Sequence, residues 1–147
     1  MGHAHAKIRT GGVTADAIPP TRDVAAFLVG AARAGVSFKA TAGLHHAIRA
    51  AHPLTYAADS PTAVMHGFVN VFLAAGLARA GGSLDEVAAI LDETDPSAFR
   101  FEPAGVHWRS RAIALTQLQE TRDRFARSFG SCSFTEPVQD LHAWGLL

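Results

Sequence analysis

The pattern of apolar and polar positions divides the chain into short alternating segments and longer helical ones. Ala6 and Ile8 alternate with polar residues up to the turn Thr10-Gly11-Gly12, which predicts a first strand over residues 4–9. After Pro19-Pro20, apolar residues recur at helical spacing until Gly35, which predicts a helix that begins near Thr21. A second strand is predicted over residues 36–42, and a long loop follows it to residue 60.

The middle of the chain predicts two consecutive helices. Ser60-Pro61 places a capping residue before a proline suited to the first helical position, and one apolar face then continues to Gly81-Gly82. Ser83 and Glu86 form a capping box for the next helix, which ends before Asp95-Pro96.

The last third of the chain is more mixed. The segment FRFEPAGVHW alternates large apolar and polar residues around a Pro-Ala-Gly turn, so it predicts either a small hairpin, which we favour, or one strand and a loop. Residues 110–127 predict a charged helix, residues 129–134 a short buried strand, and residues 136–141 a final helical turn or two.

This order of elements predicts an α/β fold in one domain over residues 1–147. Alternating strands and helices are typical of a mostly parallel sheet with right-handed crossovers, and about four such units make half of a (β/α)8-type barrel. A half-barrel leaves open sheet edges, which proteins normally pair or cover, so we expect a homodimer. Residues 1–5, with their alternation of histidine and alanine, are expected to be flexible or to derive from the expression vector.

Composition narrows the class of protein. Thirteen basic and thirteen acidic side chains cancel, which argues against a nucleic-acid or membrane-surface partner. The longest apolar stretch, residues 64–80, is interrupted by His66, Asn70 and Arg79, so it predicts a buried helix rather than a membrane span. One cysteine and no apolar leader fit a cytoplasmic protein.

Two resemblances add to this interpretation. The blocks AKIRTGGVTADA, FKATAGLHHAIR, MHGFVNVFLAAGLA, FRFEPAGVHWR and SFGSCSFTEPVQDLHAWGLL resemble the C-terminal half of a family of longer bacterial barrel-like proteins with no assigned activity. More locally, KATAGL and KIRTGGV resemble two strand-end motifs of class I aldolases of the deoxyribose-phosphate type, in reverse order and without that family's acidic partner. The second resemblance implies a Schiff-base lysine at Lys39 and a substrate-facing lysine at Lys7.

Polar residues at the carboxyl ends of parallel strands are the natural candidates for chemistry, because these ends face the ligand crevice. Lys39 would be a free amine or proton carrier if it were desolvated in an apolar mouth, and a snorkelling surface lysine otherwise. His45 or His46 would act as general acid or base, and Glu136 as an acid in the same mouth. Cys132 is expected to be a buried, inert thiol.

The expected substrate-binding residues surround these groups. Arg9 with the glycine turn would bind an anion, and Asn70 would either contact substrate or cap a neighbouring loop. The full predicted set is Lys7, Arg9, Thr10, Gly11, Gly12, Thr41, Asn70, Ser131 and Ser133.

Three functional hypotheses follow. The first is a small enzyme of lyase or isomerase type that acts on an anionic carbonyl or carboxylate and needs no cofactor, since no dinucleotide or P-loop motif is present. The second is a metal-dependent enzyme with a divalent ion held by His45, His46 and His66. The third is a non-catalytic ligand-binding or assembly domain.

Overall fold

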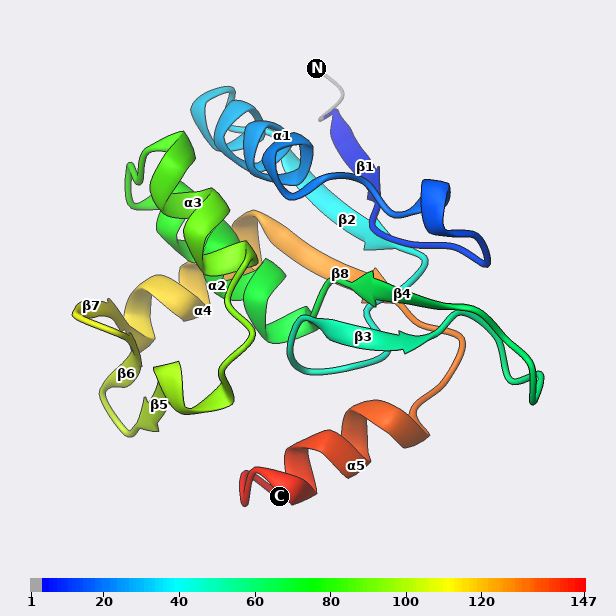
Figure 1. The fold of residues 1–147 in the computed structure, drawn as a ribbon. Helices are drawn as coiled ribbons and strands as arrows, with labels where there is room; N and C mark the ends of the chain where they lie inside the picture. Colours follow the sequence, from blue (N-terminus) through cyan, green and yellow to red (C-terminus); the bar gives the residue numbers. More distant parts are fainter. Residues whose placement is uncertain (1–3) are drawn as a thin grey trace.

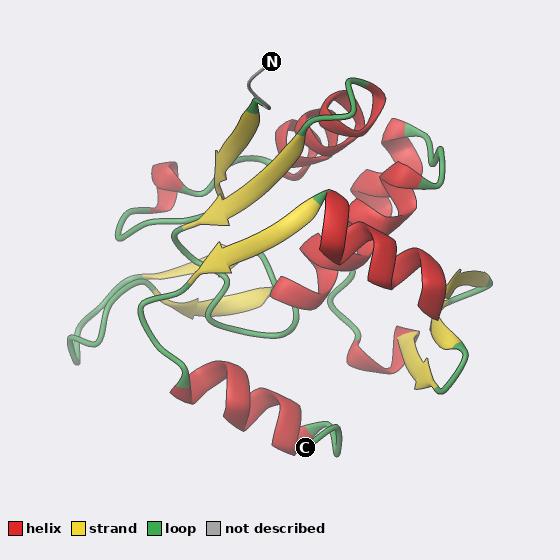
Figure 2. Ribbon diagram, turned by 180° about the vertical axis from the view of Figure 1, so that it is seen from behind, coloured by secondary structure: helices red, strands yellow, loops and turns green. Residues whose placement is uncertain are grey.

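A three-stranded parallel sheet forms the centre of the molecule. The computed structural model describes residues 4–147, so the predicted flexibility of residues 1–3 lies outside the described residues. The sheet has the order β1-β2-β8, from β1 (His5–Arg9), β2 (Ser37–Thr41) and β8 (Ala126–Gly130). All three strands end on the same side of the molecule (Figures 1 and 2).

Four helices lie on one side of this sheet (Figure 1). They are α1 (Thr21–Arg33), α2 (Phe68–Arg79), α3 (Leu84–Leu91) and α4 (Leu115–Arg124). Helices α1, α2 and α4 pack nearest to the sheet, and α3 packs against α1 and α2 (Figure 1). Phe38 and Ala40 of β2 are buried on the helix side, where the Phe38 ring packs edge-on against Phe27 and Phe125. Helix α2 is buried around most of its circumference and forms the centre of the helical layer.

Two small antiparallel sheets complete the fold. The hairpin of β3 (Ala50–Pro53) and β4 (Thr62–Met65) lies near the carboxyl ends of the parallel strands. The meander of β5 (Phe99–Glu102), β6 (Gly105–Trp108) and β7 (Arg111–Ala114) packs beside α4. The remaining elements are α5 (Thr135–Ala143) and the 3-10 turns η1 (Ala15–Ala17) and η2 (Pro96–Ala98).

The mixed α/β class is confirmed, whereas four parallel β/α units are not what the structure shows. Within residues 4–147 only β1, β2 and β8 are parallel, and the other five strands pair antiparallel with their sequence neighbours. The physical reason is local, since short strands joined by tight connections pair with each other at a lower loop-closure cost than with a distant sheet. A half-barrel is therefore not present in this part of the chain.

Several predicted boundaries were wrong. The predicted start of the second helix is instead β4 (Thr62–Met65), whose residues extend and pair with β3, and α2 begins only after Gly67. The predicted hairpin at FRFEPAGVHW is confirmed, but β7 adds a third strand where a helix was expected. Strand β8 begins at Ala126, so residues 131–134 lie in the loop before α5.

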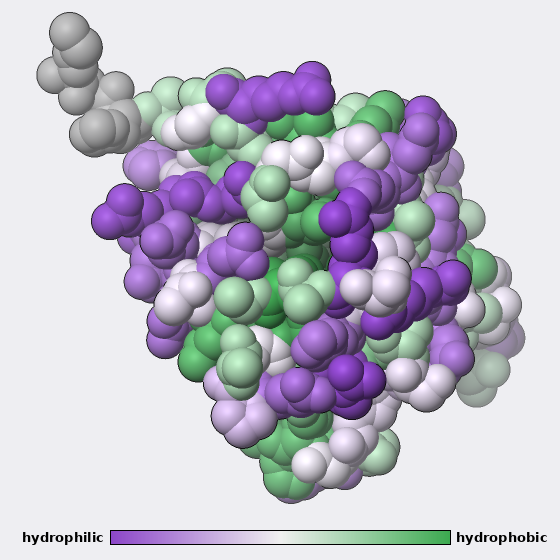
Figure 3. All heavy atoms as spheres, turned by 90° about the vertical axis from the view of Figure 1, so that its left-hand side faces the viewer, coloured by the Kyte–Doolittle hydropathy of each residue, from purple (hydrophilic) through white to green (hydrophobic). Residues whose placement is uncertain are grey.

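The surface is of mixed character. Figure 3 shows the side that carries α3 and β7, where hydrophilic and hydrophobic residues are interspersed in small patches. Across residues 4–147, no helix has both the length and the apolar content that a bilayer crossing requires.

Candidate functional site

A cavity of about 610 Å³ opens at the carboxyl ends of β1 and β2. The loops after these strands form one wall, the β3–β4 hairpin and its loop form another, and the start of α5 closes the third side. Its polar lining includes Arg9, Thr10, Gly11, Gly12, Thr55, Tyr56, His45, His46, Cys132 and Glu136. Residues from four parts of the chain therefore converge at the carboxyl ends of the parallel strands, where a ligand crevice is expected.

The glycine turns after β1 and β2 hold this wall together. The buried Thr10 donates its hydroxyl to the Ala42 carbonyl at 2.6 Å, and its backbone N–H donates to the Thr41 carbonyl. A Cβ on Gly11 would lie 2.9 Å from the Gly43 Cα atom, so the two loops approach backbone to backbone. Thr10 and Gly11 thus shape the cavity, and the Thr10 hydroxyl is already used within the protein.

The loop after β2 has an unusual backbone. Ala42, Gly43 and Leu44 have φ angles of 58°, 74° and 57°, so three consecutive residues are left-handed. This conformation costs about 1–2 kcal/mol for each residue with a side chain, so the surrounding contacts must stabilise it. It turns the chain so that His45 and His46 both reach the cavity, which a regular strand would prevent.

Arg9 lies at the rim of the cavity with an exposed side chain. Its Nε atom donates to the Gly11 carbonyl at 3.0 Å, which fixes the guanidinium next to the glycine turn. Within residues 4–147, Arg9 forms no ion pair. The terminal N–H groups are therefore suited to bind a carboxylate or phosphate.

His46 is held by an aspartate from α5. Its Nδ1 donates to Asp140 Oδ2 at 3.2 Å, and the Ala47 backbone N–H donates to the same oxygen at 2.8 Å. The His46 ring also stacks on His52 with centroids 3.5 Å apart and an interplanar angle of 8°. Because the carboxylate accepts from Nδ1, Nε2 is the basic nitrogen of the neutral ring, so the pair has the arrangement of a base and its orienting acid.

His52 supports this arrangement as a neutral ring. Burial lowers its pKa, the neighbouring His46 lowers it further, and Asp140 offsets part of the shift. Its Nε2 atom is buried and has no hydrogen-bond partner within the described chain. A neutral His52 avoids placing a second positive charge against the face of His46.

His45 lies beside the single cysteine. The Cys132 sulfur is 3.8 Å from both Nδ1 and Nε2, so the thiol contacts the ring without aligning with either nitrogen. Cys132 is exposed and lines the cavity. The prediction of a buried thiol was wrong, because β8 ends before residue 132 and leaves it in a loop.

Glu136 is a permanent anion in this cavity. Its carboxylate accepts hydrogen bonds from the hydroxyls of Ser133 and Tyr56, the latter at 2.7 Å. These bonds, Ser133 first, lower the pKa of Glu136 to about 2. Glu136 lines the cavity, and its lowered pKa keeps it ionised near neutral pH, which argues against the predicted role as an acid.

The serines after β8 have structural partners. Ser133 bonds Glu136 and accepts from the Thr135 backbone N–H, which organises the start of α5. The Ser131 hydroxyl accepts from the Ser133 N–H at 3.4 Å. Neither serine lines the cavity.

The predicted strand residues Lys7, Lys39 and Thr41 lie outside the cavity lining. Both lysines are exposed on the sheet face opposite the helices. Lys39 therefore does not lie in an apolar mouth, which was the condition for its predicted role as a free amine. The Thr41 hydroxyl donates to the Ile8 carbonyl at 3.2 Å and joins the two strands.

His66 is a buried side chain that is already hydrogen-bonded within the protein. It is 1% exposed, its Nε2 donates to the Pro19 carbonyl at 2.8 Å, and burial lowers its pKa. It does not line the cavity with His45 and His46. In the described part of the chain, no three His, Cys, Asp or Glu side chains are grouped to hold a metal ion.

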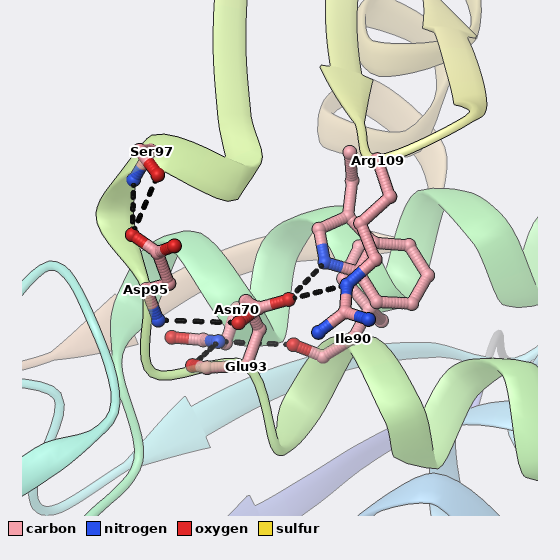
Figure 4. Close-up of polar contacts among 7 residues, drawn as sticks. Asn70, Ile90, Glu93, Asp95, Ser97 and Arg109 are labelled. Atoms are coloured by element: carbon pink, nitrogen blue, oxygen red, sulfur yellow. Dashed lines mark hydrogen bonds and ion pairs between the residues drawn. The ribbon is translucent and has the colours of Figure 1, made fainter.

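Asn70 belongs to a buried structural network (Figure 4). Its amide donates to the carbonyls of Ile90 and Glu93, and its oxygen accepts from the Arg49 N–H. All hydrogen-bonding groups of this fully buried side chain are thus engaged, so it caps loops rather than contacting substrate.

The same network contains a buried carboxylate. Glu93 is 5% exposed and accepts from Trp108 Nε1 at 3.0 Å, Arg109 Nε at 2.7 Å and the Asp95 backbone N–H. Burial raises the pKa of Glu93, but these donors, Arg109 first, outweigh it and leave the pKa below its usual value. Glu93 thereby anchors the β5–β7 meander to the helical layer (Figure 4).

Sequence reasoning missed three residues at the site: Tyr56, His52 and Asp140. They come from the β3–β4 hairpin and from α5, far in sequence from the strand ends. The spacing of Glu136 and Asp140, one helical turn apart, was the available signal that both lie on one face of α5.

Comparisons with family models, curated proteins and solved structures found no match to this chain. The resemblances drawn from the sequence blocks therefore stay predictions.

Proposed function

We propose that the protein is a small cytoplasmic enzyme of lyase or isomerase type, which moves a proton on an anionic carbonyl or carboxylate compound. The observation that carries this proposal is the His46–Asp140 pair at the cavity that also contains Arg9. A base with a fixed tautomer and a cation for the substrate anion are the minimum for such chemistry.

Each side chain has a separate role. Arg9 would bind the carboxylate or phosphate of the substrate, and His46 Nε2 would accept the proton from the carbon next to the carbonyl. Asp140 would keep the ring oriented and stabilise its protonated form. His45, which also lines the cavity, would supply the proton to the carbonyl oxygen. His46 rather than Lys39 would transfer the proton, because Lys39 is exposed and does not line the cavity.

Hydrogen exchange tests the proposal without knowledge of the complete reaction. The enzyme is incubated in D2O with pyruvate, oxaloacetate, glyceraldehyde 3-phosphate and dihydroxyacetone phosphate, and deuteration next to the carbonyl is followed by NMR. We expect the wild type to deuterate at least one compound and His46→Asn to be at least about 100-fold slower. Arg33→Gln, which removes an exposed cation on α1, is the matched comparison, and it should retain the basal exchange.

Two outcomes would contradict the proposal. One is that no compound in the panel exchanges faster than in the protein-free blank. The other is that His46→Asn exchanges at the wild-type rate while Lys39→Gln does not, because the Lys39 amine would then be the group that accepts the proton.

We also propose that the protein is a homodimer, in which a second copy covers or pairs with the open edges of the parallel sheet. Strands β1 and β8 are each paired on one edge only within residues 4–147, and such edges are commonly paired or covered. Light scattering after size-exclusion chromatography should give twice the monomer mass. A monomer mass at all concentrations would contradict this assembly.

A further inference from the structure

The two faces of the parallel sheet differ in chemistry, and the register of the strands arranges the open face in rows. Partners across β1, β2 and β8 point to the same side, so each row is defined by one residue from each strand. The middle row holds Lys7, Lys39 and Ser128, all exposed. The next row toward the cavity holds Arg9, Thr41 and Gly130.

Lys7 and Lys39 are the two lysines of the whole chain, and they are direct register partners on neighbouring strands. Like charges in this relation repel, so the placement lowers stability. Within residues 4–147 neither ammonium forms an ion pair, and the ion pairs that do form use arginine or histidine. A bound anion between the two ammonium groups would remove the repulsion, and the Ser128 hydroxyl beside them is a further donor.

The middle row is connected to the cavity. The Lys39 Cε atom lies 3.9 Å from where a Cβ of Gly130 would be, so its side chain leans toward the row of Arg9. Two rows on one face are separated by two residues, about 7 Å. One compact ligand can therefore contact Arg9 with one anionic group and the lysine pair with another.

We propose that the ligand of this site carries two anionic groups, one bound by Arg9 at the cavity rim and the other by Lys7, Lys39 and Ser128 on the open sheet face. This inference rests on the proposed function and specifies its substrate class as a short dicarboxylate or a phosphorylated carboxylate. Lysine suits the outer position, because its flexible stem lets two ammonium groups converge on one anion.

Isotope labelling of the lysines tests this directly. Reductive methylation with 13C-formaldehyde keeps the charge and labels Lys7, Lys39 and the α-amine, and the variants Lys7→Gln and Lys39→Gln assign the signals. Acetate, malonate, succinate, glutarate and inorganic phosphate are then titrated at constant ionic strength.

We expect at least one dicarboxylate to shift both lysine signals with a lower Kd than acetate. Lys7→Gln and Lys39→Gln should each weaken that dicarboxylate about 5- to 10-fold and leave acetate unchanged, whereas Arg9→Gln should weaken both. Arg33→Gln, an exposed cation on α1, is the matched control and should have no effect.

The inference is overturned if dicarboxylates bind no more tightly than acetate, or if they bind without shifting the lysine signals. An effect of Arg33→Gln equal to that of Lys39→Gln would overturn it as well, because binding would then reflect overall charge. His46→Asn should leave this binding intact, so a failure of the acid–base proposal is distinguishable. Conversely, His46-dependent deuteration of pyruvate without any dicarboxylate preference would refute the second anion site alone.

Discussion

Replacing Asp140 with asparagine tests how the candidate base is held. Asp140 accepts two hydrogen bonds across the site, from the Ala47 N–H at 2.8 Å and from His46 Nδ1 at 3.2 Å. Hydrogen bonds to charged groups contribute about 1.5–3 kcal/mol when buried, and the low end applies because this carboxylate is 30% exposed. Asparagine retains one acceptor oxygen, so the expected loss is about 1–2 kcal/mol.

The loss should be local to α5. No residue of this helix is fully buried, so the hydrogen bonds of Asp140 make up a large part of its contacts with the protein, beside the packing of its C-cap Trp144 on Phe101. We therefore expect amide hydrogen exchange across residues 135–143 to accelerate about 5- to 30-fold in Asp140→Asn, with α2 unchanged. Hydrogen–deuterium exchange with mass spectrometry measures both segments in one experiment.

The matched control is Asp123→Asn, an exposed aspartate on α4, which should leave the exchange of α5 at the wild-type rate. Unchanged exchange in α5 of Asp140→Asn would refute the reasoning. So would an equal acceleration in α2, because the aspartate would then support global rather than local stability.

Three further predictions concern the scaffold around the site. Glu93→Gln should lower the free energy of unfolding by about 2 kcal/mol in urea denaturation, because it removes the buried carboxylate that accepts from Arg109 and Trp108. The control Glu120→Gln replaces an exposed glutamate and should leave the free energy of unfolding unchanged. Equal effects of the two substitutions would contradict the anchoring role of Glu93. The folded pKa of Glu93 is depressed, so its contribution to the free energy of unfolding is complete above the unfolded pKa near 4.3 and is lost as the pH falls below that value. Between pH 7 and pH 3, the free energy of unfolding should therefore fall more in the wild type than in Glu93→Gln. Parallel curves for the two proteins would refute this. Gly43→Ala should cost more than Gly35→Ala, since both have positive φ but only the former packs against another backbone, and a larger or equal cost at Gly35 would show that φ alone decides.

Local patterns predicted the elements whose signals come from adjacent residues. The alternation around Ile8, the capping box at Ser83 and the turn in FRFEPAGVHW all correspond to observed elements. The hairpin β3–β4 was missed because Ser60-Pro61 is also a good helix start, and only pairing with β3 decides between the two. Strand β8 was misplaced because its first residues were assigned to the preceding charged helix, and the packing of Phe129 on Phe68 and Phe72 of α2 is not visible in the sequence.

Some residues of the candidate site could likewise be predicted from local patterns, and others could not. Arg9 and the histidines after β2 could be predicted, because parallel strands bring their carboxyl ends to one edge. Asp140 and Tyr56 could not, because their positions depend on how α5 and the hairpin pack over that edge. The side-by-side placement of Lys7 and Lys39 on the open face could not be predicted either, because it depends on the strand register.

The most direct test of the central claim is a double-mutant cycle on carbon-bound deuterium exchange. Rate constants for the most reactive panel compound are compared for the wild type, His46→Asn, Asp140→Asn and the double variant. If Asp140 acts through His46, the double variant should be no slower than His46→Asn, because the two residues work as one unit. Additive losses in the double variant, or a wild-type rate in Asp140→Asn, would contradict this account of the site.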